Sequence, residues 1–466
     1  MRFEREEKKP ITGKQYPSDR VAKTNNQLLL LMTSVGSKRN IMGRGTIALD
    51  EREHDGDSCI RERSEMNGYT DLNEWIASTL EYVHRQRPVI AKEELMKDVM
   101  GHLCSIVRLH LTWPSSSSDF PSTVIAKIPN TASLVEKLQG VLVDEVQVAS
   151  APDDSYLQLI HETEIDTYTM LNKGECVGLA VPFFYGALPF SSPNPCILIE
   201  DVNSTKAIDV IDGFDDDKLY KIVDQIVALH VYAFTHDEWE ALGEKSLMAE
   251  MEDTESYQQF VKMNDSMNQN LRSAYPLLSE GLQLLHKNYT CNHLWYMEQL
   301  RHYKSKVNLK FPFKGVLRTM VHGDLWTSNI LWRDNDLAAI VDWANCHPGS
   351  LTEDLQRVLV TSCSVERRQR LIRPLLEHYF EKVQMKLKKK CKDMPFTFED
   401  LEKDYRRTLP FTCAQTVFAL GMWLHTGVLR KGGSDDEARV QEMVARLHSI
   451  LDETVIAHKW KHTADS

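Results

Sequence analysis

The stretch VHGDLWTSNILWRDNDLAAIVDW, residues 321–343, is the part of the chain around which the rest is organised. Two short apolar runs, ILW and LAAIV, flank the polar cluster RDND. A polar cluster between two apolar runs is typical of the turn of a β-hairpin. With the turn centred between Asn335 and Asp336, the hairpin pairs Asn329 with Asp342 at its open end.

Three oxygen-bearing side chains are expected to meet at this open end. They are Asp324, Asn329 five residues later, and Asp342 on the returning strand. Carboxylate and amide oxygens suit a hard divalent cation, and one carboxylate would remain for proton chemistry. The alternative is a hairpin whose polar residues only cap a turn. The occurrence of all three residues in this order favours the cation site.

The motif HGD at residues 322–324, followed by Asn329, resembles the catalytic loop of kinases, and Asp342 takes the place of their second metal ligand. The position between His and Asp, usually Arg in eukaryotic protein kinases, is Gly323. The H-G-D form resembles aminoglycoside phosphotransferases and choline kinases, which phosphorylate small molecules. Together with Trp326 and the segment IVDW, the motif sequence is most similar to that of the ecdysteroid-kinase-like (choline-kinase-like, CHK) family.

This resemblance spans about residues 95–430. It implies an α+β, bilobal protein-kinase-like fold, with a small β-rich N-terminal lobe and a larger, mostly helical C-terminal lobe. It also implies ATP and Mg²⁺ as cofactors, Asp324 as the catalytic residue, and Asn329 and Asp342 as the metal ligands. We expect the smaller lobe at residues 71–199 and the larger lobe at 200–466.

Bulk properties exclude several classes of protein. The 466 residues carry a net charge of −12, which argues against a nucleic-acid or anionic-membrane surface as the main function. The nine cysteines are scattered without a C-x-x-C pair, so reduced thiols in a cytoplasmic protein are expected. No run approaches the roughly 20 apolar residues that cross a bilayer. The sequence indicates no obligate protein partner.

Residues 1–70 differ from the rest of the chain. Charges of both signs alternate with Gly, Ser and Asn, and apart from the run Leu28–Leu31 there is little apolar surface to bury. We expect a flexible leader; the alternative is a small helix docked on the body. A helix with Asp71 or Thr70 as its cap should follow and run to about His84.

A loop and a hairpin in the first lobe would bind nucleotide. The loop at residues 100–105 contains Gly101 and Ser105, and a glycine there can let the backbone approach phosphates closely. A simple β-turn is the alternative. The strand at 123–128 ends near Lys127, and its sequence resembles that of the strand that supplies the phosphate-binding lysine of kinases. An exposed strand lysine is the alternative for Lys127 taken alone.

The partner of Lys127 is predicted from helical periodicity. Residues 155–171 predict a helix, and Glu164 lies on its apolar stripe, four residues from Ile160 and from Tyr168. A buried carboxylate is costly unless it is paired, so we expect an ion pair with Lys127. Glu162 is the competitor, but its helical neighbours place it on a polar face.

Further segments complete the expected nucleotide site and the second lobe. The strand 196–202 resembles the hinge that binds the adenine edge, with Glu200 and Val202 as candidates; the alternative is a strand exit capped by Asp201. A helix is expected over 216–233, with His230 as a hydrogen-bonded core residue, and another over 411–429. Residues 346–350 are expected to form a turn. The family resemblance implies that Asp354 braces the catalytic loop.

The expected reaction transfers the γ-phosphoryl group of ATP to a hydroxyl of a small-molecule acceptor. Alternatives are a choline- or ethanolamine-type kinase and a nucleotide-binding pseudokinase that acts through protein contacts. A choline site would need an aromatic and acidic cage, for which Trp423 and Tyr379 are available but are not shown to converge. Sterol-like or other lipophilic alcohols, glycosides and xenobiotics all remain open as acceptors.

Overall fold

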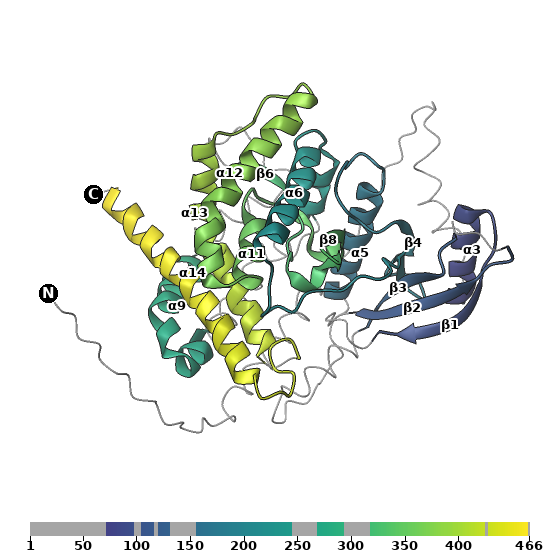
Figure 1. Cartoon of the computed structure of the whole chain (residues 1–466), viewed down its shortest axis with the longest axis horizontal. Coiled ribbons are helices and arrows are strands. Elements are labelled where there is room, and N and C mark those ends of the chain that lie inside the picture. Colours follow the sequence, from purple (N-terminus) through teal and green to yellow (C-terminus); the bar gives the residue numbers. More distant parts are fainter. Residues whose placement is uncertain are drawn as a thin grey trace, which may run out of the picture.

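The computed structural model describes residues 71–96, 104–115, 120–130, 155–244, 268–292, 317–424 and 427–464. The expected leader, residues 1–70, lies outside this part of the chain. Within it, a β-rich lobe and a mostly helical lobe lie side by side (Figure 1). We call them the smaller and the larger lobe.

The sheet of the smaller lobe is antiparallel throughout. Its strand order is β1-β2-β3-β5-β4. The strands are β1 (Val89–Leu95), β2 (Cys104–Thr112), β3 (Thr123–Pro129), β4 (Phe184–Leu188) and β5 (Cys196–Glu200). The sequence did not predict β1, because this edge strand is mostly exposed and lacks an apolar face.

The two faces of this sheet pack against different partners. On one face, helix α3 (Leu72–His84) buries Trp75, Ile76 and Leu80 against a small core. Asp71 caps this helix as expected, accepting a hydrogen bond from the backbone of Asn73. Alternate residues of β3 and β5 point to the other face and join the core of the larger lobe.

Helix α5 (Ser155–Leu171) has the bounds predicted from the sequence. It contacts β4 in the smaller lobe and the short helices η1 (Glu238–Glu244) and η5 (Trp343–Asn345) further along the chain. Tyr168 is fully buried and stacks on Phe184 at 5.8 Å between ring centroids. The apolar stripe therefore faces the interior, as its spacing indicated.

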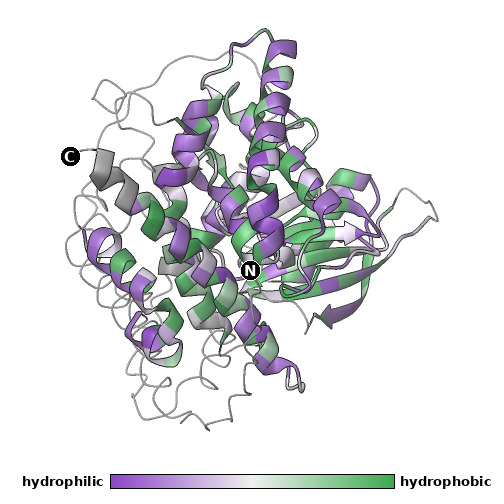
Figure 2. Cartoon of the chain, turned by 60° about the vertical axis from the view of Figure 1, so that its left-hand side comes forward, coloured by the Kyte–Doolittle hydropathy of each residue, from purple (hydrophilic) through white to green (hydrophobic). Residues whose placement is uncertain are grey.

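The larger lobe is built around one continuous hydrophobic core. Its described α-helices are α6 (Asp216–Ala233), α9 (Ser279–Leu285), α11 (Glu353–Thr361), α12 (Val365–Lys389), α13 (Phe398–Trp423) and α14 (Asp436–Ala464). Short helices η2 (Pro276–Leu278), η3 (His286–Thr290) and η4 (Thr327–Asn329) connect other elements. Figure 2 shows hydrophilic and hydrophobic residues along each of the long helices, as expected of helices with one buried side.

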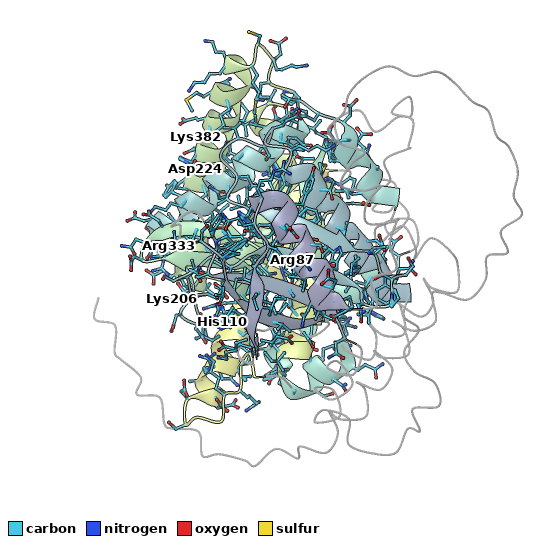
Figure 3. All side chains as sticks on the ribbon, turned by 90° about the vertical axis from the view of Figure 1, so that its right-hand side faces the viewer. Arg87, His110, Lys206, Asp224, Arg333 and Lys382 are labelled. Atoms are coloured by element: carbon cyan, nitrogen blue, oxygen red, sulfur yellow. The ribbon has the colours of Figure 1, made fainter. Side chains whose placement is uncertain are left out.

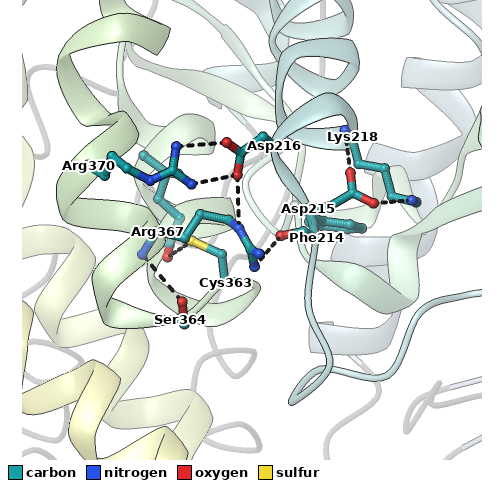
Figure 4. A network of polar contacts seen from close by, with 9 residues as sticks. Phe214, Asp215, Asp216, Lys218, Cys363, Ser364, Arg367 and Arg370 are labelled. Atoms are coloured by element: carbon teal, nitrogen blue, oxygen red, sulfur yellow. Dashed lines mark hydrogen bonds and ion pairs between the residues drawn. The ribbon is translucent and has the colours of Figure 1, made fainter.

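Helices α6 and α12 are joined by a polar network at the start of α6 (Figure 4). Asp216, in the first turn of α6, accepts hydrogen bonds from Arg367 and Arg370 of α12. Deeper in the same interface, His230 is fully buried and bonded to the Tyr379 hydroxyl at 2.7 Å. His230 is therefore a core residue, as expected.

Two predicted elements of the larger lobe are wrong. Residues 346–350 do not form a simple turn, because His347–Ser350 is strand β9, paired with β6 (Arg318–Val321). Helix α13 begins at Phe398, not at residue 411, and ends at Trp423. The prediction missed the buried residues Leu401, Tyr405 and Leu409, which form an apolar stripe among the charged residues of its first turns, and the helix continues through Pro410.

The architecture is a bilobal, α+β protein-kinase-like fold, in agreement with the sequence. The chain leaves the sheet after β5, which ends at Glu200; the domain boundary between residues 199 and 200 stays a prediction. Among the described helices, none is both long enough and apolar enough to span a membrane.

Candidate active site

The predicted hairpin exists, but its register differs from the prediction. Strands β7 (Ile330–Arg333) and β8 (Asp336–Ile340) pair Ile330 with Ile340. The backbone of Val341 donates to the Asn329 carbonyl, so Asn329 does not lie opposite Asp342. A two-residue turn with Asp334 in the left-handed region, and a bulge next to Leu331, together change the register.

The structure nevertheless brings Asp324 and Asn329 together. Asn329 ends η4 just before β7. Its Nδ2 donates to the Asp324 carbonyl oxygen at 2.8 Å and to Oδ2 of the Asp324 side chain at 3.3 Å. The amide is 6% exposed, whereas the Asp324 side chain is 26% exposed. The carboxylate is thus held in place yet accessible.

Lys127 joins the two lobes. Its Nζ lies 2.5 Å from Oε2 of Glu164 on α5 and 2.6 Å from Oδ1 of Asp342 at the end of the hairpin. Asp342 adopts the left-handed conformation (φ 67°, ψ 60°), and η5 follows it. Such backbone strain is common at functional sites. Glu162 instead accepts from the backbone of Phe190, so the expected choice of Glu164 as the ion-pair partner is confirmed.

One ammonium therefore faces two carboxylates. Burial opposes the charge of Lys127, but Asp342 and Glu164 outweigh it and hold the pKa of Lys127 well above its usual value. Burial raises the pKa of Glu164 to about 7, although Lys127 attracts its charged form. The Glu164 side chain is 2% exposed and that of Asp342 is 36% exposed, so Asp342 is the more accessible acid.

Asp354 braces the loop that carries Asp324. Its two carboxylate oxygens accept from the backbone of His322 at 2.7 Å and of Gly323 at 3.0 Å. The ring of His322 accepts from the Asp324 backbone and donates to the Val341 carbonyl. Loop and hairpin are therefore tied to one another through backbone atoms, as the family resemblance implied for Asp354.

Gly323 lies where a side chain has no room. Its φ is +80°, and an added Cβ would lie 2.2 Å from the Asn345 carbonyl oxygen. That oxygen also accepts from Nδ1 of His347, whose Nε2 faces Glu353 at 3.0 Å. Although burial opposes it, Glu353 raises the pKa of His347. The buried pair of His347 and Glu353 thus lies next to the backbone that Gly323 approaches.

Sequence reasoning missed Arg357. Its Nη2 donates to Oδ1 of Asp324 at 2.9 Å, and its guanidinium lies 5.7 Å from the centre of the Trp423 ring. Trp423 in turn stacks on Trp326 of the loop at 4.6 Å. The available signal was spacing, because Arg357 follows Asp354 by three residues and so shares its helix face.

The expected nucleotide-binding residues have mixed placements. Gly101 lies outside the described residues. Ser105 is in β2, and its hydroxyl accepts from Asn130. Glu200 is exposed and accepts from the Phe183 backbone, and the Val202 carbonyl accepts from Thr205. Strand β2 begins at Cys104, within the loop expected at residues 100–105.

Asn329 and Asp342 fit the chemistry of a magnesium site. Because Nδ2 of Asn329 is used by Asp324, the amide presents its oxygen as the remaining group, and Asp342 offers a carboxylate. Mg²⁺ commonly takes only one or two protein ligands, with water and phosphate oxygens completing its shell. In the described part of the chain, no group of three or more His, Cys, Asp or Glu residues is arranged to hold a metal.

Solved structures similar to this chain include two phosphotransferases. The macrolide 2′-phosphotransferase MphH from Brachybacterium faecium, as the apoenzyme, is 12% identical with a TM-score of 0.37, covering 80% of this chain and 97% of that one. Aminoglycoside phosphotransferase APH(2″)-Ib, ADP-bound, is 12% identical with a TM-score of 0.40, covering 82% and 99%. The kinase-like architecture described above rests on this chain's own sheet and helices.

Two proteins of Caenorhabditis elegans are similar in sequence. "Uncharacterized oxidoreductase dhs-27" is 23% identical over 323 residues, which are 66% of this chain and 36% of that protein. "Uncharacterized kinase-like protein D1044.1" is 31% identical over 146 residues, 30% of this chain and 38% of that protein. The matched region spans little more than a third of either relative.

One family model covers most of the chain. It is DUF1679, described as "Uncharacterized oxidoreductase dhs-27", and it matches residues 90–462. The match includes the hairpin, the loop of Asp324 and both partners of Lys127. The chain belongs to the DUF1679 family. This membership is consistent with the resemblance of its motifs to the ecdysteroid-kinase-like family.

Proposed function

We propose that this protein transfers the γ-phosphoryl group of ATP to a hydroxyl of a small molecule. The observation that carries the proposal is the contact of Lys127 with both Glu164 and Asp342, residues from three separate parts of the chain. A lysine placed by a glutamate beside a metal-binding aspartate is the arrangement with which kinases hold nucleotide phosphates. The names of the kinase-like relative and of the similar phosphotransferases agree with it.

Lys127 would bind the α- and β-phosphates. Glu164 would keep the ammonium in position, and Asn329 with Asp342 would hold Mg²⁺ against the phosphate oxygens. When bound, Mg²⁺ supplies charge neutralisation to those oxygens. The chain itself contributes positioning and electrostatic stabilisation, which carry most of the rate in phosphoryl transfer.

Asp324 would orient the acceptor. One of its oxygens is held by Arg357 and the other lies near the Asn329 amide, so the carboxylate has little freedom to rotate. The acceptor oxygen attacks the γ-phosphorus, the bond from that phosphorus to the β–γ bridging oxygen breaks, and ADP leaves. The hydroxyl proton passes to Asp324 as the new bond forms.

The immediate surroundings of the site favour a small acceptor over a protein. Asp342 leads at once into η5 and then into β9, so no extended activation segment follows it in the described chain. Tyr379 and Trp423 do not combine into a cage, because Tyr379 is bonded to His230 in the core while Trp423 stacks on Trp326. This pair therefore gives no support to a choline-type acceptor.

The oxidoreductase name of the longer relative has little support in this region. All described strand pairs of this chain are antiparallel. The doubly wound fold that binds nicotinamide dinucleotides is built on a mostly parallel sheet. The match covers only 36% of that relative, whose remaining length lies beyond the comparison.

The test replaces the proposed base. Asp324→Asn should bind Mg-ATP with an affinity close to that of the unaltered protein and should release no ADP with any alcohol that the unaltered protein phosphorylates. The panel should include sterol-like alcohols, other lipophilic alcohols, glycosides and xenobiotics. Asp334→Asn, in the exposed turn of the same hairpin, is the matched control and should keep full turnover.

Near-full turnover in Asp324→Asn would refute the assignment of the base. Binding of Mg-ATP without turnover on any alcohol would favour the pseudokinase alternative. Absence of Mg-ATP binding in the unaltered protein would refute the proposed function itself.

A further inference from the structure

The smaller lobe contains an arginine that the reaction outlined above does not use. Arg108 of β2 donates from Nε to Oδ2 of Asp201 at 2.6 Å and from Nη2 to Oδ1 at 3.2 Å. Asp201 follows β5 directly, in the segment expected to act as the hinge. The side chains are 30% and 5% exposed, so the acid is buried and the arginine is partly open. The pair spans β3, which lies between the two strands.

The strand register places Arg108 on the same face of the sheet as Lys127. Ile106 of β2 pairs with Lys127, and Arg108 pairs with Ile125 two residues further along. Side chains two positions apart on a strand point to the same face, about 7 Å apart. The intervening residues, such as Val107 and Leu109, belong to the core under α3 on the opposite face.

This face is the one turned toward the larger lobe. Ile125 and the β5 residues Ile197 and Ile199 pack into the core of the larger lobe. The segment after the hinge is tied to the β7–β8 hairpin, because Lys206 and Trp332 exchange backbone hydrogen bonds. Arg108 therefore lies between the proposed phosphate-binding Lys127 and the expected hinge, on the face of the sheet that is turned toward the larger lobe.

We propose that the guanidinium of Arg108 stacks on the purine base of the bound nucleotide. The ion pair with Asp201 fixes the orientation of the guanidinium plane for this contact. The inference rests on the proposed function. A bidentate pair with a carboxylate fixes the guanidinium plane and leaves its face available. Arginine stacks on aromatic rings through cation–π attraction, and this attraction strengthens when the contact is desolvated.

The stack predicts which ligands depend on Arg108. The guanidinium face contacts the π-face of the base, so the stack should strengthen the binding of adenine and of guanine nucleotides alike. Inorganic tripolyphosphate, which lacks a base, should not. Arg108→Leu should weaken the binding of Mg-ATP and Mg-GTP roughly tenfold and leave that of Mg-tripolyphosphate unchanged.

The control is Arg87→Leu. Arg87 also pairs with carboxylates, those of Glu74 and Glu81, but it is 38% exposed and borders α3, away from the face that carries Lys127. Figure 3 looks at the smaller lobe from its outer side and labels this residue. The control variant should bind all three ligands as the unaltered protein does.

Isothermal titration of the full chain with each ligand measures the effect. Equal weakening of all three ligands in Arg108→Leu would mean that the ion pair only supports the sheet, and it would overturn the inference, as would no change in any. If Arg108→Leu does not fold, Arg108→Lys keeps the charge without the planar group and should weaken Mg-ATP several-fold while sparing Mg-tripolyphosphate. An unaltered protein that binds none of the ligands would refute the proposed function together with this inference, whereas normal binding with no effect of Arg108 refutes the inference alone.

Discussion

Replacing Gly323 by alanine tests whether the catalytic loop depends on a close backbone approach. Gly323 has a φ of +80°, and a Cβ would be placed 2.2 Å from the Asn345 carbonyl oxygen and 2.9 Å from Nδ1 of His347. Contacts of a Cβ below 3.0 Å are essentially never seen, and here the nearest atom belongs to the backbone. The loop or η5 would have to move by about 1 Å to relieve the contact.

Gly432 provides a matched control for the backbone conformation. Its φ is +81°, yet an added Cβ would meet nothing within 4 Å. Gly432→Ala should therefore lower the free energy of unfolding only by the strain of an alanine in the left-handed region, about 1–2 kcal/mol. Gly323→Ala should lower it by the same strain and, because of overpacking, by about 1–3 kcal/mol more. The difference between the two variants isolates the contact with Asn345.

Urea unfolding followed by circular dichroism compares the free energies of unfolding, and release of ADP with an alcohol acceptor measures turnover. We expect Gly323→Ala to be the less stable variant and to lose turnover, because the shift displaces Asp324 from Asn329 and Arg357. Gly432→Ala should keep turnover. Equal stability of the two variants, with turnover retained in Gly323→Ala, would refute the reasoning.

Three further changes have defined outcomes. Lys127→Met should weaken Mg-ATP binding by roughly 10- to 100-fold, the loss expected for one charge-assisted contact, and calorimetric titration that finds an unchanged affinity would exclude the phosphate-binding role. Arg357→Met should lower kcat for a phosphorylated alcohol more than it lowers Mg-ATP affinity, because the residue touches Asp324 and neither Lys127 nor its partners; a loss confined to nucleotide affinity would contradict this. Because Glu353 holds the pKa of buried His347 above its usual value, the pair contributes stability that is complete below about pH 6.5 and is lost as the pH rises through the higher folded-state pKa. Urea midpoints of His347→Gln should lack this fall, and an identical pH profile in both proteins would disprove the contribution.

Local patterns predicted much of the candidate site. The helix over 155–171 has the predicted bounds, and placing Glu164 on its apolar stripe identified the partner of Lys127. The spacing of apolar residues along a helix shows which of its faces is buried, and an acidic residue on that face needs a cationic partner. The spacing from Asp324 to Asn329 likewise predicted a contact within one short loop.

Other features depend on contacts between distant segments. The hairpin register was predicted one to two residues out of place, because the turn conformation at Asp334 and the bulge near Leu331 cannot be read from apolar runs alone. Strand β9 was missed because His347–Ser350 becomes a strand only by pairing with β6. Its sequence, with a proline and a glycine, has little strand propensity of its own.

From the sequence by itself, the resemblance of its motifs to a known family predicted the fold class and most of the candidate site residues, and helical periodicity predicted the partner of Lys127, because motifs and periodicity lie in neighbouring positions. Only the tertiary structure placed Lys127 against Asp342, Arg357 against Asp324, and Arg108 against Asp201. These pairs join residues 215, 33 and 93 positions apart. The sequence pattern around a long charged side chain does not show which acid it will contact. That choice depends on how the lobes and helices pack.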